Sequence, residues 1–322
     1  MMDNKQLFLY TGKKGIAEAE KFNEKGLASY SVNLGNICEF GCSYCYVPSI
    51  TLKQKTVQDV LKKGYTVDDI SSYRPRNNVL ECVAKDLKKI SSDDNNYVFF
   101  CTTCDPCATE EHTETTIDAI RLIMEGSSLQ VRVLSKSALI TRVAKSLIDY
   151  KERITYSLST GTASSPISKA IEERASSITD RVHALQWLQD KGFRTYGMIC
   201  PVLPSEVDNL KQLLDQVRPD LCEGVWGEAV NVRGRSLENT LNKLKEAGLE
   251  EDAKELQWVM GNKKVWIEYA KNLFLGFQKE MRDRELLDKL HFLQYVSKHD
   301  REFYEGNSGA VCLYKKKKKT TI

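Results

Sequence analysis

Three cysteines within eight residues, Cys38-Glu39-Phe40-Gly41-Cys42-Ser43-Tyr44-Cys45, decide the fold of this chain. The stretch follows directly on an apolar run at residues 27–34, which we interpret as the first β-strand. Gly41 lets the backbone of the loop turn tightly. A short loop of closely spaced thiols after a strand is typical of a metal site held by thiolates.

Two metals fit such a loop. Thiolates are the preferred ligands of iron–sulfur clusters, and the CxxxCxxC spacing would place three sulfurs on three of the four irons of a [4Fe-4S] cubane. The fourth iron would be free to chelate S-adenosylmethionine (SAM), and one electron could then break a carbon–sulfur bond to give a 5'-deoxyadenosyl radical. A structural zinc normally takes four ligands in paired CxxC form, so the spacing favours iron.

The composition is that of an ordinary globular protein of 322 residues, 41% hydrophobic and 28% charged. The N-terminal residues 1–6 lack the apolar stretch of a signal peptide, and no run of roughly 18 apolar residues occurs. We therefore expect a cytoplasmic protein without a membrane partner.

Ten cysteines in such a chain are better explained by metal ligation than by disulfides. The net charge of +3 is too small to indicate a nucleic-acid partner by itself.

Short apolar runs alternate with amphipathic patterns of helical period. The predicted strands are 27–34, 97–100, 131–134, 154–158, 195–199 and 224–226. The predicted helices between them are 79–90, 116–124, 139–150, 177–191 and 207–217. This alternation indicates α/β architecture with a parallel sheet, and we predict a partial (β/α)6 TIM-like barrel with a C-terminal helical extension. The expected organisation is an N-terminal segment, the barrel, a helical region and a basic tail, at residues 1–27, 28–236, 237–314 and 315–322.

The CxxxCxYC pattern after the first strand resembles the signature of the radical SAM superfamily. Over residues 28–236 the chain is similar to the spore photoproduct lyase-like branch, beginning with the tyrosines on both sides of the third cysteine. The other stretches that carry the resemblance follow in the family's order: Cys101-Thr102-Thr103-Cys104-Asp105, Leu134-Ser135-Lys136-Ser137, Tyr156-Ser157-Leu158-Ser159, the run 172–181 with Asp180-Arg181, and 192–204.

The resemblance implies a role for individual residues. The cluster ligands would be Cys38, Cys42 and Cys45. The residues around SAM would be Cys104 near the amino group, Lys136 on the carboxylate, Ser157 beside the molecule, and Glu172, with Arg181, at the ribose. The candidates for the radical chemistry would be Cys101, Tyr44 and Tyr46. For two of these an ordinary interpretation stays open, since Lys136 could be a solvated residue of the barrel rim and Glu172 an exposed helical glutamate.

A second group of cysteines, Cys101, Cys104 and Cys107, lies where the second strand meets its loop, at the end where barrels build active sites. One thiol could supply a hydrogen atom during the reaction, or the three could hold a second metal with Cys200 or His112. They could also be small buried residues without chemistry. When the segments are aligned on the following aspartate, the lyase cysteine falls at Thr102, so this part departs from the family pattern.

The best hypothesis is an enzyme that abstracts hydrogen from a nucleic-acid base or nucleotide, for repair or modification, with a reductant such as flavodoxin or ferredoxin. A peptide or small-molecule substrate is one alternative, and a nonenzymatic zinc-binding or nucleic-acid-binding module is another. The run Lys315–Lys319 could add nonspecific phosphate binding but is typical of a solvated tail. The DNA-gripping hairpin expected near the C-terminus of a true lyase is not apparent, because residues 237–281 have a helical pattern.

Overall fold

The computed structural model describes residues 12–62, 64 and 75–314. Its strands form two ladders of hydrogen-bonded neighbours, in the orders β1-β2-β3-β4-β5-β6 and β10-β9-β8-β7. All pairs are parallel except β1 with β2. The strands are β1 (Ala17–Glu18), β2 (Tyr30–Val32), β3 (Tyr97–Phe100), β4 (Gln130–Ser135), β5 (Ile154–Leu158), β6 (Arg194–Thr195), β7 (Gly197–Val202), β8 (Val225–Ala229), β9 (Leu290–Val296) and β10 (Ala310–Tyr314).

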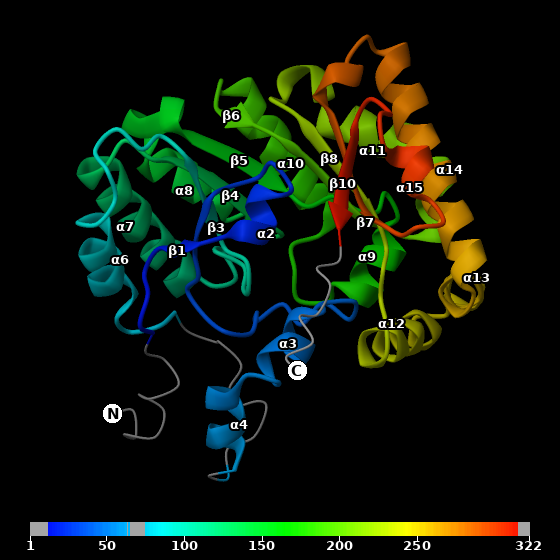
Figure 1. The fold of residues 1–322 in the computed structure, drawn as a ribbon, viewed down its shortest axis with the longest axis horizontal. Helices are drawn as coiled ribbons and strands as arrows, with labels where there is room; N and C mark the ends of the chain where they lie inside the picture. Colours follow the sequence, from blue (N-terminus) through cyan, green and yellow to red (C-terminus); the bar gives the residue numbers. More distant parts are fainter. Residues whose placement is uncertain (1–11, 63, 65–74, 315–322) are drawn as a thin grey trace.

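The two ladders join between β5 and β7 into one open, curved sheet (Figure 1). A parallel bridge pairs Ser159 with Met198, and the backbone N–H of Tyr196 donates to the carbonyl of Tyr156 at 3.1 Å. Because the strands run parallel, their carboxyl ends meet along one edge, where loops from many strands can build one site.

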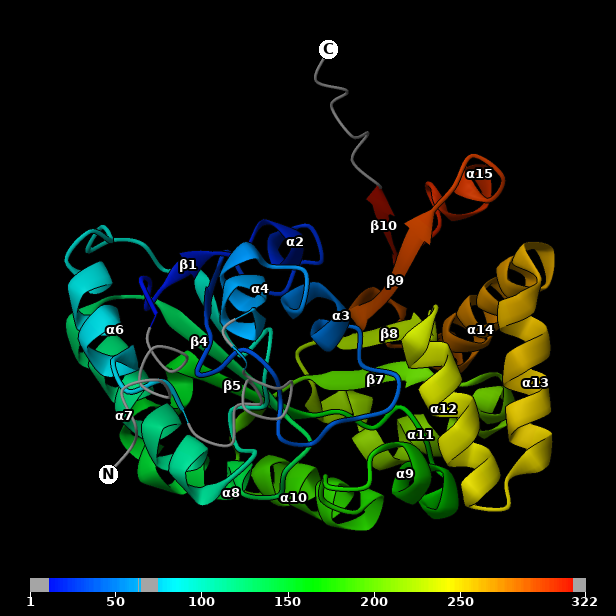
Figure 2. The same ribbon diagram turned by 90° about the horizontal axis from the view of Figure 1, so that it is seen from below.

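Helices cover the outer face of the sheet, while α2 and α3 lie on the other side (Figure 2). The helices are α2 (Glu20–Asn23), α3 (Val47–Thr51), α4 (Lys55–Leu61), α6 (Val79–Leu87), α7 (Glu110–Gly126), α8 (Ile140–Ser146), α9 (Ser165–Ile171), α10 (Ile178–Asp190), α11 (Leu210–Val217), α12 (Arg235–Glu246), α13 (Glu250–Gly261), α14 (Lys263–Asp283) and α15 (Arg301–Tyr304). Short 3₁₀ turns occupy Ile148–Arg153, Pro204–Asn209, Pro219–Leu221 and Leu287–Lys289.

Capping side chains fix where the site-bearing helices begin. The Ser177 hydroxyl accepts the backbone N–H of Asp180 at 3.1 Å at the start of α10. Thr109 does the same for His112 at 3.2 Å at the start of α7. Each cap satisfies a backbone donor that has no partner inside the helix. The two caps therefore fix the residues at which α10 and α7 begin.

Burial on both faces explains the apolar strands. All five residues of β5 are buried, as expected for a parallel strand with covering layers on both sides. One core packs the sheet against the outer helices, and at Gly227 a Cβ atom would come within 2.7 Å of the Phe277 ring. A smaller cluster lies on the other face and includes Leu27, Phe99, Met198 and Trp226. This second cluster packs beneath the cavity described below, which Leu27, Phe99 and Met198 also line.

The predicted fold class, an α/β partial barrel with a parallel sheet, is confirmed, and the predicted strands correspond to β2, β3, β4, β5, β6 with β7, and β8. The structure differs from the sequence-based expectation over 237–314. Helices α12 to α14 are followed by β9, which pairs with β8, and by β10, which pairs with β9. Buried Leu290, Phe292 and Val296 hold β9 in the core, so the sheet continues past the expected sixth strand.

Two expected segments fall partly or wholly outside the described residues. The N-terminal segment predicted at 1–27 is described from residue 12 onward, and the basic tail predicted at 315–322 lies outside the description. Among the described residues, no helix combines the length and apolar character that crossing a bilayer requires.

Candidate active site

A cavity of about 340 Å³ opens at the carboxyl ends of the strands. Residues in β3, β4, β7 and β8 and in the loops following β2, β3, β4, β5 and β8 contribute to its wall. Its volume lies in the range of small-molecule sites, which is about 300–1,000 Å³. Of the predicted site residues, the following line this cavity: Cys38, Cys42, Tyr44, Cys45, Tyr46, Cys101, Cys104 and Lys136.

The cysteine loop forms one side of the cavity. Gly41 has a φ of +57°, a conformation that favours glycine, and the Cys45 N–H donates to the Cys42 carbonyl at 3.0 Å. The Ser43 N–H donates to the Ile171 carbonyl at 2.9 Å, which anchors the loop to the end of α9. The sequence-based interpretation of Gly41 as the residue that permits the turn agrees with this geometry.

The donor set fits an iron–sulfur cluster better than it fits zinc. Three thiols from one loop face one cavity, and three thiolates are what a cubane with one open iron requires. In the part of the chain that the structure describes, no three His, Cys, Asp or Glu side chains are gathered tightly enough to hold a metal ion. The three thiols of the loop therefore line one cavity, but they do not yet stand close enough together to bind one metal ion.

Burial governs the protonation of these thiols. It raises the pKa of Cys42 to about 12, and it also raises the pKa values of Cys38 and Cys45. Each residue is therefore a neutral thiol in the protein alone. Metal ligation releases the proton and stabilises the thiolate, so binding of iron by this loop would depend on pH.

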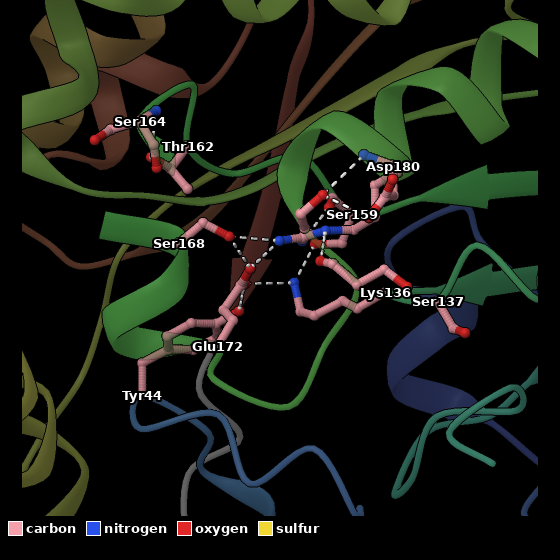
Figure 3. A network of polar contacts seen from close by, with 12 residues as sticks. Tyr44, Lys136, Ser137, Ser159, Thr162, Ser164, Ser168, Glu172 and Asp180 are labelled. Carbon is pink, nitrogen blue, oxygen red and sulfur yellow. Dashed lines mark hydrogen bonds and ion pairs between the residues drawn. The ribbon is translucent and has the colours of Figure 1, made fainter. Parts of the chain in front are cut away.

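Glu172 sits at the centre of a buried polar network beside the loop (Figure 3). Its carboxylate accepts hydrogen bonds from the Tyr44 hydroxyl, from Ser168 at 3.3 Å and from Arg181 at 2.5 Å, and lies 2.9 Å from the Lys136 ammonium. Burial by itself would raise the pKa of Glu172, but Lys136 and Arg181 outweigh it and lower that pKa to about 2. The carboxylate is ionised throughout the physiological range.

Arg181 is fully buried and acts as the fixed partner of this carboxylate. Its guanidinium also donates to the Ser159 carbonyl at 2.7 Å, the Ser176 carbonyl at 3.0 Å and the Ser168 hydroxyl at 2.7 Å. Neither Arg181 nor Glu172 is among the residues that line the cavity. The structure therefore brings Glu172 and Arg181 close to Lys136 but leaves both off the cavity wall. A direct contact with a ribose would require Glu172 to lie on that wall.

Lys136 is held at both ends. Its backbone N–H donates to an Asp105 carboxylate oxygen at 2.8 Å, and its ammonium donates to the Ser159 hydroxyl at 2.5 Å. Asp105 also accepts from the Ser135 hydroxyl at 2.7 Å and from the Cys107 N–H at 2.8 Å. Asp105 thereby ties the loop after β3 to the end of β4. The signal for this role in the sequence is a carboxylate that follows closely on the predicted strand 97–100.

Ser157, predicted to lie beside SAM, is placed elsewhere. It is fully buried, it is not among the cavity-lining residues, and its hydroxyl has no hydrogen-bond partner among the described residues. Ser159, two residues further on, lines the cavity and bonds Lys136. The cavity begins one residue after the end of β5 at Leu158, and sequence reasoning alone did not locate that boundary.

The second group of cysteines divides. Cys101 and Cys104 line the cavity, and burial, with the Cys104 side chain nearby, raises the pKa of the Cys101 thiol. Cys107 is fully buried outside the cavity lining, and so is His112, whose Nδ1 lies 2.9 Å from the Thr109 hydroxyl. Of the two candidates for a fourth ligand of a second metal, Cys200 lines the cavity and His112 does not.

The family model described as the radical SAM superfamily matches residues 32–217. Among curated proteins, the uncharacterized protein ORF301 of Acidianus two-tailed virus is 23% identical over 221 residues, which is 65% of this chain and 69% of that protein.

Solved structures that resemble this chain include a variant of spore photoproduct lyase and anSMEcpe with bound AdoMet. The first has a TM-score of 0.49 and 14% identity, and covers 68% of this chain and 62% of that one. The second has a TM-score of 0.46 and 15% identity, and covers 80% and 60%. Both matches take in less than two thirds of the solved chain. The family model, however, spans more than half of this protein. The chain belongs to the radical SAM superfamily, which implies a [4Fe-4S] cluster and SAM as its cofactors.

Proposed function

We propose that Cys38, Cys42 and Cys45 hold the cluster of this radical SAM enzyme, and that its substrate is a nucleic-acid base or nucleotide. One observation carries the first part: the three thiols line the same cavity as Lys136 and Cys104. A bound cluster would supply the electron that breaks a carbon–sulfur bond of SAM, giving methionine and a 5'-deoxyadenosyl radical. The reaction that follows is hydrogen abstraction from the substrate, for repair or modification.

Lys136 is the residue that orients SAM in this proposal. Lys136 lines the cavity, and its ammonium is proposed to donate a charge-assisted hydrogen bond to the SAM carboxylate. Glu172 and Ser159 hold that ammonium in place, and Arg181 fixes Glu172. Glu172 and Arg181 are therefore proposed as positioning residues that act through Lys136. Cys104 stands on the same wall and is proposed to contact the amino group of SAM.

Three residues are proposed for the radical steps. Cys101 lines the cavity beside Cys104, and its S–H is proposed to give a hydrogen atom to a substrate radical. The thiyl radical left on Cys101 would regain its thiol by taking one electron from the reductant and one proton. Tyr46 lines the cavity and is 59% exposed, which leaves it accessible to a substrate. The Tyr44 hydroxyl already donates to Glu172, so its part is to anchor the cysteine loop to the network as much as to relay a radical.

The nucleic-acid substrate rests on the resemblance to the spore photoproduct lyase-like branch, carried by Tyr44 and Tyr46 around Cys45 and by the later stretches. The run Lys315–Lys319 would add phosphate binding that weakens with salt. A cytoplasmic location and a reductant such as flavodoxin or ferredoxin are part of the same proposal.

The decisive experiment uses protein purified and reconstituted without oxygen. Iron, sulfide and the 5'-deoxyadenosine formed from SAM and dithionite are measured for wild type, for Cys42→Ala and for the control Cys312→Ala, whose thiol lies outside the cavity lining. About four irons per chain are expected, with loss of iron and product in Cys42→Ala alone. A zinc protein that leaves SAM intact would contradict the proposal.

The substrate class is tested separately with the reconstituted enzyme. Nucleic acid that copurifies with the anaerobic protein and is released by salt supports a nucleic-acid substrate. Active enzyme that retains no nucleic acid, and binds none when it is added, would favour a peptide or small molecule instead.

A further inference from the structure

The cavity has a second charged group on its wall, formed by elements other than those that carry Lys136. Lys25 precedes β2 and Glu228 belongs to β8, and both line the cavity. The Trp226 indole N–H donates to the Lys25 carbonyl at 3.1 Å, so the chain before β2 is fastened to β8. The two charges are therefore held on a fixed part of the barrel.

These charges are only loosely paired. The Lys25 Nζ atom lies 3.9 Å from a Glu228 carboxylate oxygen, beyond hydrogen-bonding distance. Among the described residues, neither charged group has a side-chain hydrogen bond. Yet the side chains are only 14% and 25% exposed. Mostly buried charges without close partners are costly, and both groups keep hydrogen-bonding capacity that a bound molecule can satisfy.

Aromatic rings surround the pair. The Lys25 ammonium lies 5.8 Å from the centre of the Phe22 ring and 5.7 Å from that of Tyr295. Phe22 and the exposed Tyr46 also line the cavity. Flat apolar surfaces next to hydrogen-bonding groups suit a planar ring that stacks on one side and is recognised along one edge.

The charges restrict what such a ligand can be. A free phosphate or carboxylate would meet Glu228, and a cationic group would meet Lys25, so neither is favoured at the pair. A neutral ligand with an acceptor for Lys25 and a donor for Glu228 satisfies both. In a trans peptide bond the N–H and C=O point to opposite sides, whereas a nucleobase presents donor and acceptor side by side.

We propose that Lys25 and Glu228 bind the donor–acceptor edge of a nucleobase, with the ammonium donating to a ring acceptor and the carboxylate accepting a base N–H. This assignment rests on the proposed nucleic-acid function and names the residues that read the substrate. It places the base on a part of the cavity wall distinct from Lys136. A carboxamide side chain of Asn or Gln shares this edge chemistry and is the competing ligand.

The test compares wild-type holoprotein with Lys25→Met and Glu228→Gln, reconstituted without oxygen and saturated with SAM. Binding of the dinucleoside monophosphates TpT, dApA, dCpC and dGpG, and of the peptide Gly-Gln-Gly, is measured by equilibrium dialysis. The matched controls are Lys254→Met and Glu251→Gln, an exposed ion pair on α13. Iron content and the Kd for SAM report whether each variant keeps the cofactor site.

Each cavity variant is expected to weaken binding of the preferred dinucleoside about tenfold, with iron content, SAM affinity and the control variants unchanged. A charge-swapped double variant, Lys25→Glu with Glu228→Lys, exchanges donor and acceptor. The double variant should therefore prefer a different dinucleoside from the one that wild type prefers. A variant that had merely unfolded would lose binding and would not gain a new preference.

The failures are distinguishable. If wild type binds a dinucleoside and the cavity variants bind it equally well, this assignment is wrong while the proposed function stands. If the variants lose SAM affinity instead, the pair serves the cofactor and the assignment is also wrong. A wild-type holoprotein that cleaves SAM but binds only the glutamine peptide, or none of the probes, contradicts the nucleic-acid substrate and the nucleobase assignment together.

Discussion

The Lys136 ammonium lies 2.9 Å from the Glu172 carboxylate, an ion pair that joins a cavity-lining residue to the buried carboxylate at the centre of the polar network. Glu172 in turn bonds Arg181, whose side chain has no exposure. Breaking a buried pair leaves an uncompensated charge, which costs far more than losing a pair on the surface. The pair therefore couples the geometry of the cavity to the stability of the barrel.

Glu172→Gln should lower the free energy of unfolding by about 3 kcal/mol, because Arg181 and Lys136 lose their buried counter-charge. The control is Glu173→Gln, whose side chain is 68% exposed and pairs loosely with Lys243. That substitution should change stability by less than about 0.5 kcal/mol. Urea unfolding of the protein without cofactor checks both, and equal effects of the two variants would contradict the network.

Asp105→Asn should destabilise the protein by about 2 kcal/mol. The carboxylate oxygens accept three hydrogen bonds, from Ser135, Lys136 and Cys107. An amide replaces one acceptor by a donor, so in either orientation a donor faces a donor. Asp118→Asn, an exposed change on α7, is the control, and thermal and urea unfolding are the measurements. An Asp105→Asn protein as stable as the control would show that the loop after β3 is held by other contacts.

Ser157→Ala and Ser159→Ala should separate the two serines of β5 and its loop. The Ser157 hydroxyl is buried without a partner among the described residues, so its removal should leave the Kd for SAM unchanged and stability the same or higher. Ser159→Ala removes the hydroxyl that bonds Lys136 and should weaken SAM binding several-fold. Isothermal titration of anaerobic holoprotein checks this, and the reverse order of effects would restore Ser157 as the SAM contact.

The parts of the fold that could be predicted from sequence depend on local patterns. The strand at 154–158 is marked by its β-branched and aromatic residues, Ile154, Thr155 and Tyr156, and all five of its residues are buried, while the cysteine loop is marked by spacing alone. Strand β9 was missed because its short apolar run, residues 290–296, stands in a region whose charged, leucine-rich composition is dominated by helices.

The sequence predicted the cysteines proposed as cluster ligands, but it did not predict the contacts between side chains around them. Two partners of Glu172, Ser168 and Arg181, lie near it in sequence, but the Tyr44 hydroxyl that bonds it is 128 residues away. Such contacts are set by how the parallel strands curve, which no local pattern records. Lys25 and Glu228 illustrate the same point, because each alone looks like an ordinary surface charge until the fold brings both to one cavity.

His112 should make the stability of the protein depend on pH. Its side chain is fully buried, and burial lowers its pKa from 6.5 to about 4. The Nε2 atom has no hydrogen-bond partner among the described residues, so a proton there would be buried without compensation.

The sign follows from linkage. Because the pKa of folded His112 lies below its unfolded value, the unfolded chain takes up the proton first as the pH falls. The stabilisation is complete above about pH 6.5, declines as the pH falls below that value, and is lost by about pH 4. Between about pH 7.5 and pH 5 the loss should be about 2 kcal/mol.

Urea unfolding of wild type, His112→Asn and the control His299→Asn at both pH values isolates this contribution. His112→Asn is expected to be less stable at about pH 7.5, since it leaves a void in the core, but to lose about 2 kcal/mol less than wild type on going to pH 5. The exposed His299 should leave the difference between the two pH values unchanged. A His112→Asn protein with the same pH dependence as wild type would show that the imidazole is not held neutral by burial.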